Sequence, residues 1–248
     1  GEHLYALDLT KSDVLYWLSE LMKRIRAWGY DYVKLDFLYA GALPGDRQMS
    51  TQREQAYRHG LATVRAALGD AYLLTCGTPI LPSLGLCDGI RVGPDVASHW
   101  ASDRDDLLLN NFAIPGTRNA IRTTVNRLWL SPLAHADPDV VYFASAKNTL
   151  GKDEAKALQD LALVCDYKAT SDLPLWLRAG EKGALKGFLE ADAKPVEEVD
   201  FSKAMALPHP TLKDRVLGAI LGFFANQTLV LKIFDWLGKR EVKKKLRA

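Results

Sequence analysis

Residues 30–37 read Tyr-Asp-Tyr-Val-Lys-Leu-Asp-Phe, and this stretch decides how the chain is expected to fold. It is rich in aromatic and apolar residues, a composition typical of a buried parallel strand. Its charged residues gather toward the carboxyl end. Lys34 and Asp36 are two positions apart, so on a strand both side chains point to the same face. The stretch predicts a buried strand whose end carries polar chemistry.

Strand and helix patterns alternate on both sides of this stretch. A short strand at 3–7 is followed by an amphipathic helix at 13–28, with Thr10 or Ser12 as its N-cap. Further helices are expected at 52–68, 119–130 and 152–164, and further strands at 71–76, 89–92, 140–143 and 167–169. Strands separated by helices of this length imply a parallel α/β sheet, either open or closed into a barrel.

The alternation stops near residue 190. Residues 191–210 contain three prolines and many acids, which indicates a boundary between residues 1–190 and 191–248.

Composition excludes several classes of protein. Of the 248 residues, 48% are hydrophobic and 25% charged, as in ordinary globular proteins. The net charge of +2 comes from residues 239–247; the rest carries 26 basic and 29 acidic residues. We therefore expect no nucleic-acid partner, and interpret the basic tail as a solvated end rather than a phosphate or lipid contact. The longest uncharged run, 216–231, is shorter than the roughly 20 apolar residues of a membrane span.

Cysteine and histidine spacing predicts neither a disulfide framework nor a metal site. Cys76, Cys87 and Cys165 are odd in number and widely separated, and the five histidines show no ligand spacing. We expect a reducing, cytoplasmic compartment.

Three expected strand ends are polar. Lys34 and Asp36 end one, Cys76 and Gly77 follow the next, and the third runs from Arg91 to Asp95. In a β/α barrel these ends share one rim, where functional residues lie. Two carboxylates there suffice for glycoside hydrolysis: one attacks the anomeric carbon or activates water, and the other protonates the leaving oxygen. A structural Lys34–Asp36 pair and a loop salt bridge between Arg91 and Asp95 remain the alternatives.

Longer strings carry a family resemblance. Residues 32–41, Tyr-Val-Lys-Leu-Asp-Phe-Leu-Tyr-Ala-Gly, resemble the nucleophile strand of glycoside hydrolase family 36 in the α-galactosidase clan. Residues 90–96, Ile-Arg-Val-Gly-Pro-Asp-Val, followed by Trp100, resemble its acid/base segment. Asp95 in this segment lies 59 residues after Asp36. Segments 74–79, 117–120, 128–130, 137–139, 171–174 and 230–236 also resemble the family in the correct order.

The resemblance implies a retaining hydrolase of terminal α-linked galactose. It implies Asp36 as the nucleophile and Asp95 as the general acid/base, with substrate contacts from Lys34, Cys76, Gly77, Arg91 and Trp100. It implies no metal or cofactor. The expected partner is an α-galactoside oligosaccharide, and homo-oligomerisation is left open. A galactosyltransferase of the same clan and a non-catalytic fragment that keeps the motifs are the alternative functions.

The resemblance also implies a (β/α)8 TIM-type barrel, here incomplete. The chain is expected to supply barrel strands 3 to 8 within residues 1–190. The first two strands, with a tryptophan and an Asp-Asp pair that bind the galactose C4 and C6 hydroxyls, are expected to lie outside it. Residues 191–248 would then form a linker and the start of a C-terminal β-sandwich.

Overall fold

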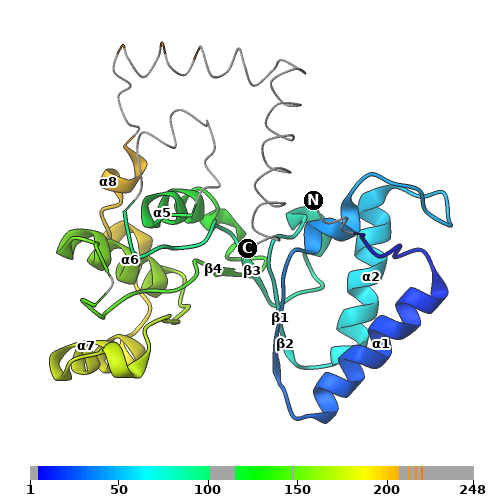
Figure 1. Ribbon diagram of the computed structural model, residues 1–248, viewed down its shortest axis with the longest axis horizontal. Coiled ribbons are helices and arrows are strands. Elements are labelled where there is room, and N and C mark those ends of the chain that lie inside the picture. The colour runs from blue at the N-terminus through cyan, green and yellow to red at the C-terminus, as the bar shows by residue number, and fades with distance from the viewer. Residues whose placement is uncertain are drawn as a thin grey trace, which may run out of the picture.

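The computed structural model describes residues 5–100, 115–146 and 148–206, together with Leu212, Val216 and Ala219. Within these residues the centre is a four-stranded parallel sheet in the order β1-β2-β3-β4 (Figure 1). Its strands are β1 (Tyr32–Leu35), β2 (Tyr72–Thr75), β3 (Gly89–Arg91) and β4 (His135–Asp137). The chain therefore has an α/β fold in which consecutive strands are neighbours.

Helices connect the strands and flank them. The α-helices are α1 (Ser12–Ala27), α2 (Arg53–Leu68), α3 (Ile80–Ser83), α5 (Thr117–Val125), α6 (Lys152–Val164), α7 (Ala179–Glu190) and α8 (Ser202–Met205). Short 3-10 turns are η1 (Leu38–Ala42), η2 (Leu128–Leu130), η3 (Pro174–Trp176) and η4 (Val196–Glu198). In Figure 1, α1 and α2 lie on one side of the strands, and α5 to α8 lie on the other.

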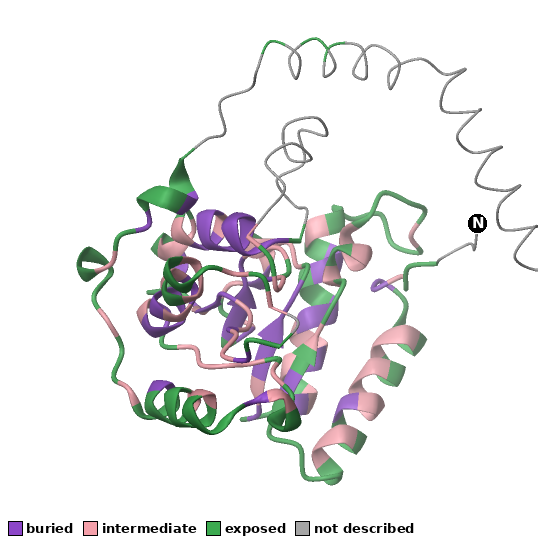
Figure 2. Ribbon diagram, turned by 60° about the vertical axis from the view of Figure 1, so that its left-hand side comes forward, coloured by how far each residue is buried: buried purple, intermediate pink, exposed green. Residues whose placement is uncertain are grey.

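The core forms where helix stripes meet the sheet. Helix α2 buries Tyr57, Leu61, Val64 and Leu68, whose spacing of four, three and four residues places them on one helix face. Helix α1 packs against α2 but buries only Met22, and its outer face is exposed (Figure 2). The hydrophobic core therefore lies between the sheet and the inner helices, and α1 is a peripheral layer.

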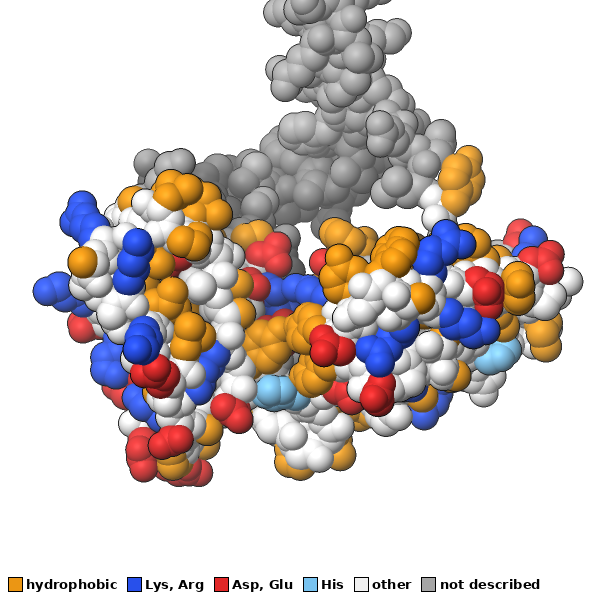
Figure 3. Space-filling view, turned by 90° about the horizontal axis from the view of Figure 1, so that it is seen from below, with side chains coloured by type: hydrophobic (Ala, Val, Ile, Leu, Met, Phe, Trp, Pro, Cys, Tyr) orange, Lys and Arg blue, Asp and Glu red, His pale blue; other side chains and the backbone are white. Residues whose placement is uncertain are grey.

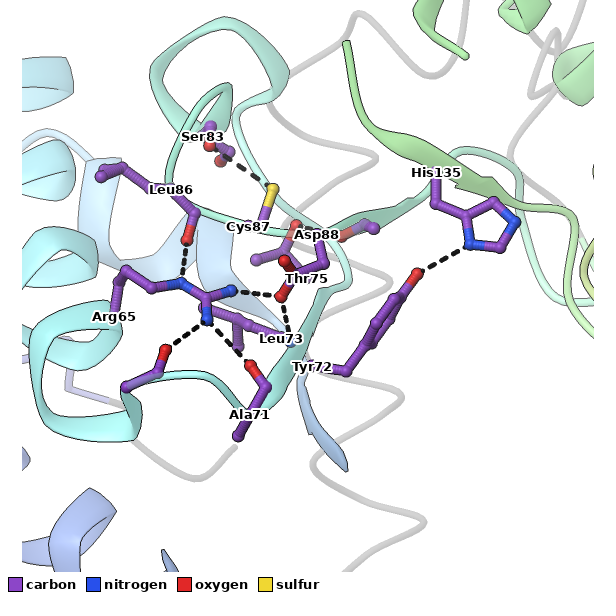
Figure 4. Close-up of polar contacts among 12 residues, drawn as sticks. Arg65, Ala71, Tyr72, Leu73, Thr75, Ser83, Leu86, Cys87, Asp88 and His135 are labelled. Atoms are coloured by element: carbon purple, nitrogen blue, oxygen red, sulfur yellow. Dashed lines mark hydrogen bonds and ion pairs between the residues drawn. The ribbon is translucent and has the colours of Figure 1, made fainter. Parts of the chain in front are cut away.

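A polar network joins the end of α2 to β2 and to the turn before β3 (Figure 4). The Arg65 guanidinium donates to the carbonyls of Leu86, at 2.9 Å, and Ala71, at 2.8 Å, and forms an ion pair with Asp88. Asp88 in turn accepts the Leu73 amide at 2.7 Å. One arginine thus satisfies backbone groups of two connections and fixes where β2 and β3 begin.

Several predicted strands differ from the observed ones. Residues 5–7 form no strand, and the first four residues of the chain lie outside the described part. The strand predicted at 140–143 is reduced to one bridge, between Val141 and Thr170, while the unpredicted β4 lies just before it. Position 170 also lies one residue beyond the strand predicted at 167–169. The strand predicted as buried, β1, buries only Val33, because it is the edge strand of the described sheet.

The predicted helices agree with the observed ones more closely than the predicted strands do. The predicted helix at 152–164 is α6, and those at 13–28 and 52–68 are α1 and α2 with ends shifted by one residue. The N-cap of α1 is Lys11 rather than Thr10 or Ser12. The helix predicted at 119–130 divides into α5 and η2. Helix α7 was not predicted, because it contains three glycines and buries only Phe188.

Residues 191–206 lie against the preceding helices. Lys194 forms an ion pair with Asp160 of α6 at 2.6 Å, and Phe201 and Ala204 are buried as α8 packs on α5. The segment at 230–236, expected to open a β-sandwich, lies outside the described residues. None of the helices in the described part of the chain has the length and apolarity needed to cross a membrane.

Candidate active site

The strand register aligns four polar side chains. Leu35, Thr75, Ile90 and Ala136 are paired across the sheet, so the residues that follow them share the next level. These are Asp36, Cys76, Arg91 and Asp137, and Arg91 and Asp137 are themselves register partners. Because residues at one level of a parallel sheet point to the same face, a carboxylate, a thiol, a guanidinium and a second carboxylate converge at the strand ends.

The carboxylate of Asp36 is held in its ionised form. Its Oδ1 accepts the Phe37 amide at 2.6 Å, and its side chain also accepts a hydrogen bond from the Cys76 thiol. Burial acts to raise the pKa of Asp36, but these two hydrogen bonds and the charges of Lys34 and Arg91 outweigh it and lower the pKa. Asp36 is therefore a charged, exposed carboxylate at the end of β1, as a nucleophile requires.

Cys76 acts as a donor at this site. Its thiol is buried, and burial together with the neighbouring Asp36 raises its pKa to about 11. The protonated thiol is a weak nucleophile but a suitable hydrogen-bond donor to the carboxylate.

The backbone after Asp36 turns sharply. Phe37 has a φ of 55°, in the left-handed region that non-glycine residues rarely adopt. The turn is fixed by β2, because the Leu38 amide donates to the Cys76 carbonyl at 3.3 Å and the Tyr39 amide to the Gly77 carbonyl at 2.6 Å. The Cys76 amide also donates to the Leu35 carbonyl at 2.8 Å, so the two predicted segments, 34–36 and 76–77, are joined directly by a backbone hydrogen bond.

Arg91 is the central cation of the site. Its side chain is only 3% exposed, and its Nη2 lies 2.5 Å from Asp139 Oδ2 and 3.0 Å from Asp95 Oδ1. Its charge and that of Lys34 also act on Asp36. Two predictions were open for Arg91, a contact with the sugar and a loop salt bridge with Asp95. The structure shows the salt bridge with Asp95 and a second one with Asp139.

Asp95 lies beyond the end of β3 on the segment that leads to α5. Its carboxylate is 77% exposed, and its backbone carbonyl accepts the Gly116 amide at 3.0 Å. The same segment has a second backbone hydrogen bond to the start of α5, in which the His99 carbonyl accepts the Thr117 amide at 3.1 Å. The start of α5 therefore holds the backbone that presents Asp95.

Two further carboxylates belong to this group and were not among the predicted site residues. Asp137 ends β4 and Asp139 follows two positions later; burial raises the pKa of both, against the opposing charges of Arg91 and Lys34. The string Asp137-Pro138-Asp139 resembles the family, but the predicted strand at 140–143 begins after it, whereas β4 ends at Asp137. A strand of three residues, His-Ala-Asp, carries too little periodicity to be predicted.

Trp100 lies in different surroundings. Its indole packs under the Lys203 ammonium, 5.2 Å from the ring centroid, beside Glu154 and Phe201. These residues line a separate cavity of about 280 Å³ between α6 and α8. This placement favours a packing role for Trp100, and its contact with the sugar stays a prediction.

A larger cavity of about 340 Å³ adjoins the site on the side of α1 and α2. Its lining is mostly apolar and includes Leu9, Trp17 and Leu61, with Asp36 as its one acidic residue. An apolar lining does not match the hydroxyl groups of a sugar, so we do not place the substrate there.

The face of the molecule seen in Figure 3 carries side chains of both charges. Acidic and basic side chains are interspersed over the face shown in Figure 3, with no large patch of one sign. Among the described residues, no group of three or more His, Cys, Asp or Glu side chains is placed to hold a metal ion.

Comparison with known proteins shows a clear relationship. No family model matches the chain. Among solved structures, it is similar to TtGalA, the α-galactosidase from Thermus thermophilus, in complex with stachyose: 49% sequence identity over 76% of this chain, with a TM-score of 0.70. The complex of TtGalA with p-nitrophenyl α-D-galactopyranoside gives the same three values. The chain spans 40% and 38% of those two chains, so it corresponds to less than half of the relative.

Proposed function

We propose that this chain is the catalytic part of a retaining glycoside hydrolase of family 36, which removes terminal α-linked galactose from oligosaccharides. The observation that carries the proposal is the ionised Asp36 at the end of β1, near Arg91, which itself pairs with Asp95, in a chain 49% identical to an α-galactosidase over 76% of its length. Consecutive parallel strands joined by helices support a (β/α)8 barrel as the framework.

The proposed mechanism is a double displacement. The Asp36 carboxylate attacks the anomeric carbon and forms an ester with galactose, while the bond to the leaving oxygen breaks and Asp95 donates its proton to that oxygen. In the second step Asp95 takes a proton from water, the water oxygen attacks the anomeric carbon, and the ester bond to Asp36 breaks. Two inversions in sequence retain the configuration.

Donors around Asp36 suit a polyhydroxylated substrate. Lys34 is an exposed charged donor for sugar hydroxyls, and Cys76 with Gly77 lies beside Asp36 as one wall of the proposed sugar site. Arg91 is buried and contributes through its charge, which acts on Asp36. The mechanism uses no metal and no organic cofactor, because two carboxylates supply both the covalent and the proton-transfer chemistry.

The cysteines support a cytoplasmic location. Cys76, Cys87 and Cys165 are all free and buried, which is the pattern that a reducing compartment favours.

The first experiment is hydrolysis of p-nitrophenyl α-galactoside by this chain and by a version extended upstream. Release of nitrophenol by either protein supports the proposal. Activity of the extended version alone would assign part of the sugar site to residues outside this chain. The absence of release from both, with folding verified by circular dichroism, would reject the activity and favour a non-catalytic role.

The retaining mechanism has its own test in Asp36→Ala. With azide present, this variant is expected to form β-galactosyl azide, because the small anion attacks the face that Asp36 vacates. Asp31→Ala is the matched control, since Asp31 is an exposed aspartate just before the same strand. An α-configured azide product, or normal turnover by Asp36→Ala, would reject Asp36 as the nucleophile.

A further inference from the structure

One nitrogen of Arg91 serves three acceptors. Its Nη2 lies 2.5 Å from Asp139 Oδ2, 3.0 Å from Asp95 Oδ1 and 3.3 Å from the Pro94 carbonyl oxygen. This nitrogen carries two protons, so the three acceptors compete for them. Asp139 is the closer and more buried of the two carboxylates, with its side chain 14% exposed against 77% for Asp95.

This competition bears on the role of Asp95. A carboxylate paired with an arginine alone is held in its ionised form, whereas a general acid must carry a proton at working pH. An arginine whose charge is already balanced by another carboxylate favours the ionised form less. Asp139 provides that balancing charge on the same nitrogen.

Asp139 is firmly fixed in this position. Its Oδ2 also accepts the amide of Val96, the residue after Asp95, at 2.8 Å. Its own amide donates to Asp137 Oδ1 at 2.7 Å, and its φ of 81° lies in the left-handed region. A non-glycine residue adopts that backbone conformation only when its surroundings impose it. The Asp139 side chain therefore contacts both Arg91, which pairs with Asp95, and the backbone next to Asp95.

We propose that Asp139 is a positioning residue that balances the charge of Arg91, so that Asp95 can take up and deliver the proton. The inference rests on the proposed function for the reaction it serves. Asp139 itself transfers nothing: the proton passes from Asp95 to the glycosidic oxygen as the C–O bond breaks, and Asp95 regains one from water.

Other charged and titratable groups surround this cluster and stay unchanged in the test. Burial raises the pKa of the Tyr142 hydroxyl, and the charges of Asp139 and Asp95 both add to this effect. The groups that act electrostatically on Arg91, Asp139 or their neighbours at the strand ends are Lys34, Asp36, Cys76 and Asp137, whereas Asp172 acts on Tyr142. Substituting position 139 changes one charge in this set.

The test is Asp139→Asn, which keeps the shape and removes the charge. With Arg91 left to pair with Asp95 alone, the basic limb of the kcat/KM profile against pH is expected to move down by about one unit. On the basic limb this lowers kcat/KM for an α-galactosyl disaccharide by about tenfold, because one pH unit is a factor of ten in the protonated fraction. For p-nitrophenyl α-galactoside, whose leaving group needs little protonation, the loss is expected to be much smaller. An unmoved limb with equal losses on both substrates would overturn the proposal.

Two further proteins separate charge balance from a merely structural role. Asp172→Asn is the control, because Asp172 also accepts backbone amides, those of Phe143 at 2.5 Å and Ala144 at 3.1 Å. It should lower the melting temperature without moving the basic limb. Arg91→Gln removes the cation and should move the limb in the opposite direction, to higher pH. A limb that moves down in Arg91→Gln would contradict the proposal.

A measurement without turnover keeps this test distinct from that of the proposed function. The Asp95 carboxyl signal, followed by 13C NMR, is expected to titrate at lower pH in Asp139→Asn than in the unchanged chain. If the chain hydrolyses no α-galactoside, the proposed function fails, and the titration still decides whether Asp139 controls Asp95. If the chain is active and neither the limb nor the signal moves, only the Asp139 inference fails.

Discussion

A Cβ atom on Gly77 would lie 3.3 Å from the Cα of Phe37, and both residues have a φ of 55°. The turn after the proposed nucleophile and the turn after the thiol donor are therefore packed backbone to backbone. Glycine is the residue that permits this approach, because it has no Cβ and tolerates a positive φ. The position of Asp36 depends on this contact.

Substitution of Gly77 by alanine is expected to lower both stability and activity. A non-glycine residue in the left-handed region costs about 1–2 kcal/mol, and the new methyl group also crowds the backbone of Phe37. We expect a loss of at least that size in the free energy of unfolding, measured by urea titration, and a fall in kcat as Asp36 is displaced. Gly85→Ala is the matched control: Gly85 also has a positive φ, of 78°, but nothing lies within 4 Å of its Cβ position. It should lose stability and keep kcat; equal kcat losses in both variants would argue against the contact.

Removal of the Asp95 carboxyl is expected to affect substrates according to their leaving groups. General acid catalysis contributes about 10²- to 10⁴-fold, so Asp95→Ala should lose that much in kcat on an α-galactosyl disaccharide. With p-nitrophenyl α-galactoside the first step needs little proton donation and should be partly spared. Steady-state rates on the two substrates decide the point. Unchanged turnover of the disaccharide would exclude Asp95 as the acid.

Loss of the Cys76 thiol is expected to shift the acid limb of the pH profile. The thiol donates to Asp36 and lowers the pKa of that carboxyl, so Cys76→Ala should raise the pKa. The nucleophile must be ionised, and activity is lost as pH falls through the pKa of Asp36. The acid limb of kcat/KM should therefore move to higher pH in Cys76→Ala and return toward its original position in Cys76→Ser, which keeps a donor. An acid limb that stays in place in Cys76→Ala would contradict this role.

The Arg65 network gives a prediction about stability alone. Lysine in place of Arg65 keeps the charge but loses the planar fork that reaches the Leu86 and Ala71 carbonyls and Asp88 together. We expect Arg65→Lys to lower the free energy of unfolding by about 1 kcal/mol, because partly buried carbonyl acceptors lose their donor. Arg53→Lys is the control, since Arg53 is exposed and contacts only the adjacent Glu54 in the described structure. Similar urea midpoints for both variants would show that the network contributes little.

The polar residues at the strand ends could be predicted from the local sequence pattern. Lys34, Asp36, Cys76 and Arg91 were predicted to share one rim, and the strand register confirms that Asp36, Cys76 and Arg91 occupy neighbouring positions there. That inference needed only the order of strands and helices and the two-residue period of a strand. The longest periodic helices were likewise predicted within one residue, because a stripe such as Tyr57, Leu61, Val64 and Leu68 repeats often enough to be recognised.

Features set by distant contacts were missed. Asp139 was not among the predicted site residues: β4 has three residues and no readable period, and the contact of Asp139 with Arg91 comes from another strand. Trp100 is predicted to contact the sugar, and the structure adds a contact between its ring and Lys203, which is about a hundred positions away in the chain. Neither contact has a local signal in the sequence.

The sequence by itself therefore determined the alternation of helices and parallel strands, the polar residues at the strand ends and the relationship to α-galactosidases. These follow from periodicity and from the identity of short strings. Only the tertiary structure decided which carboxylates share Arg91 and how the backbone turns after Asp36. The physical reason is that hydrogen bonds and ion pairs between strands depend on register and on the positions of atoms to within a few tenths of an ångström. These positions are fixed only when the sheet and its helices pack together.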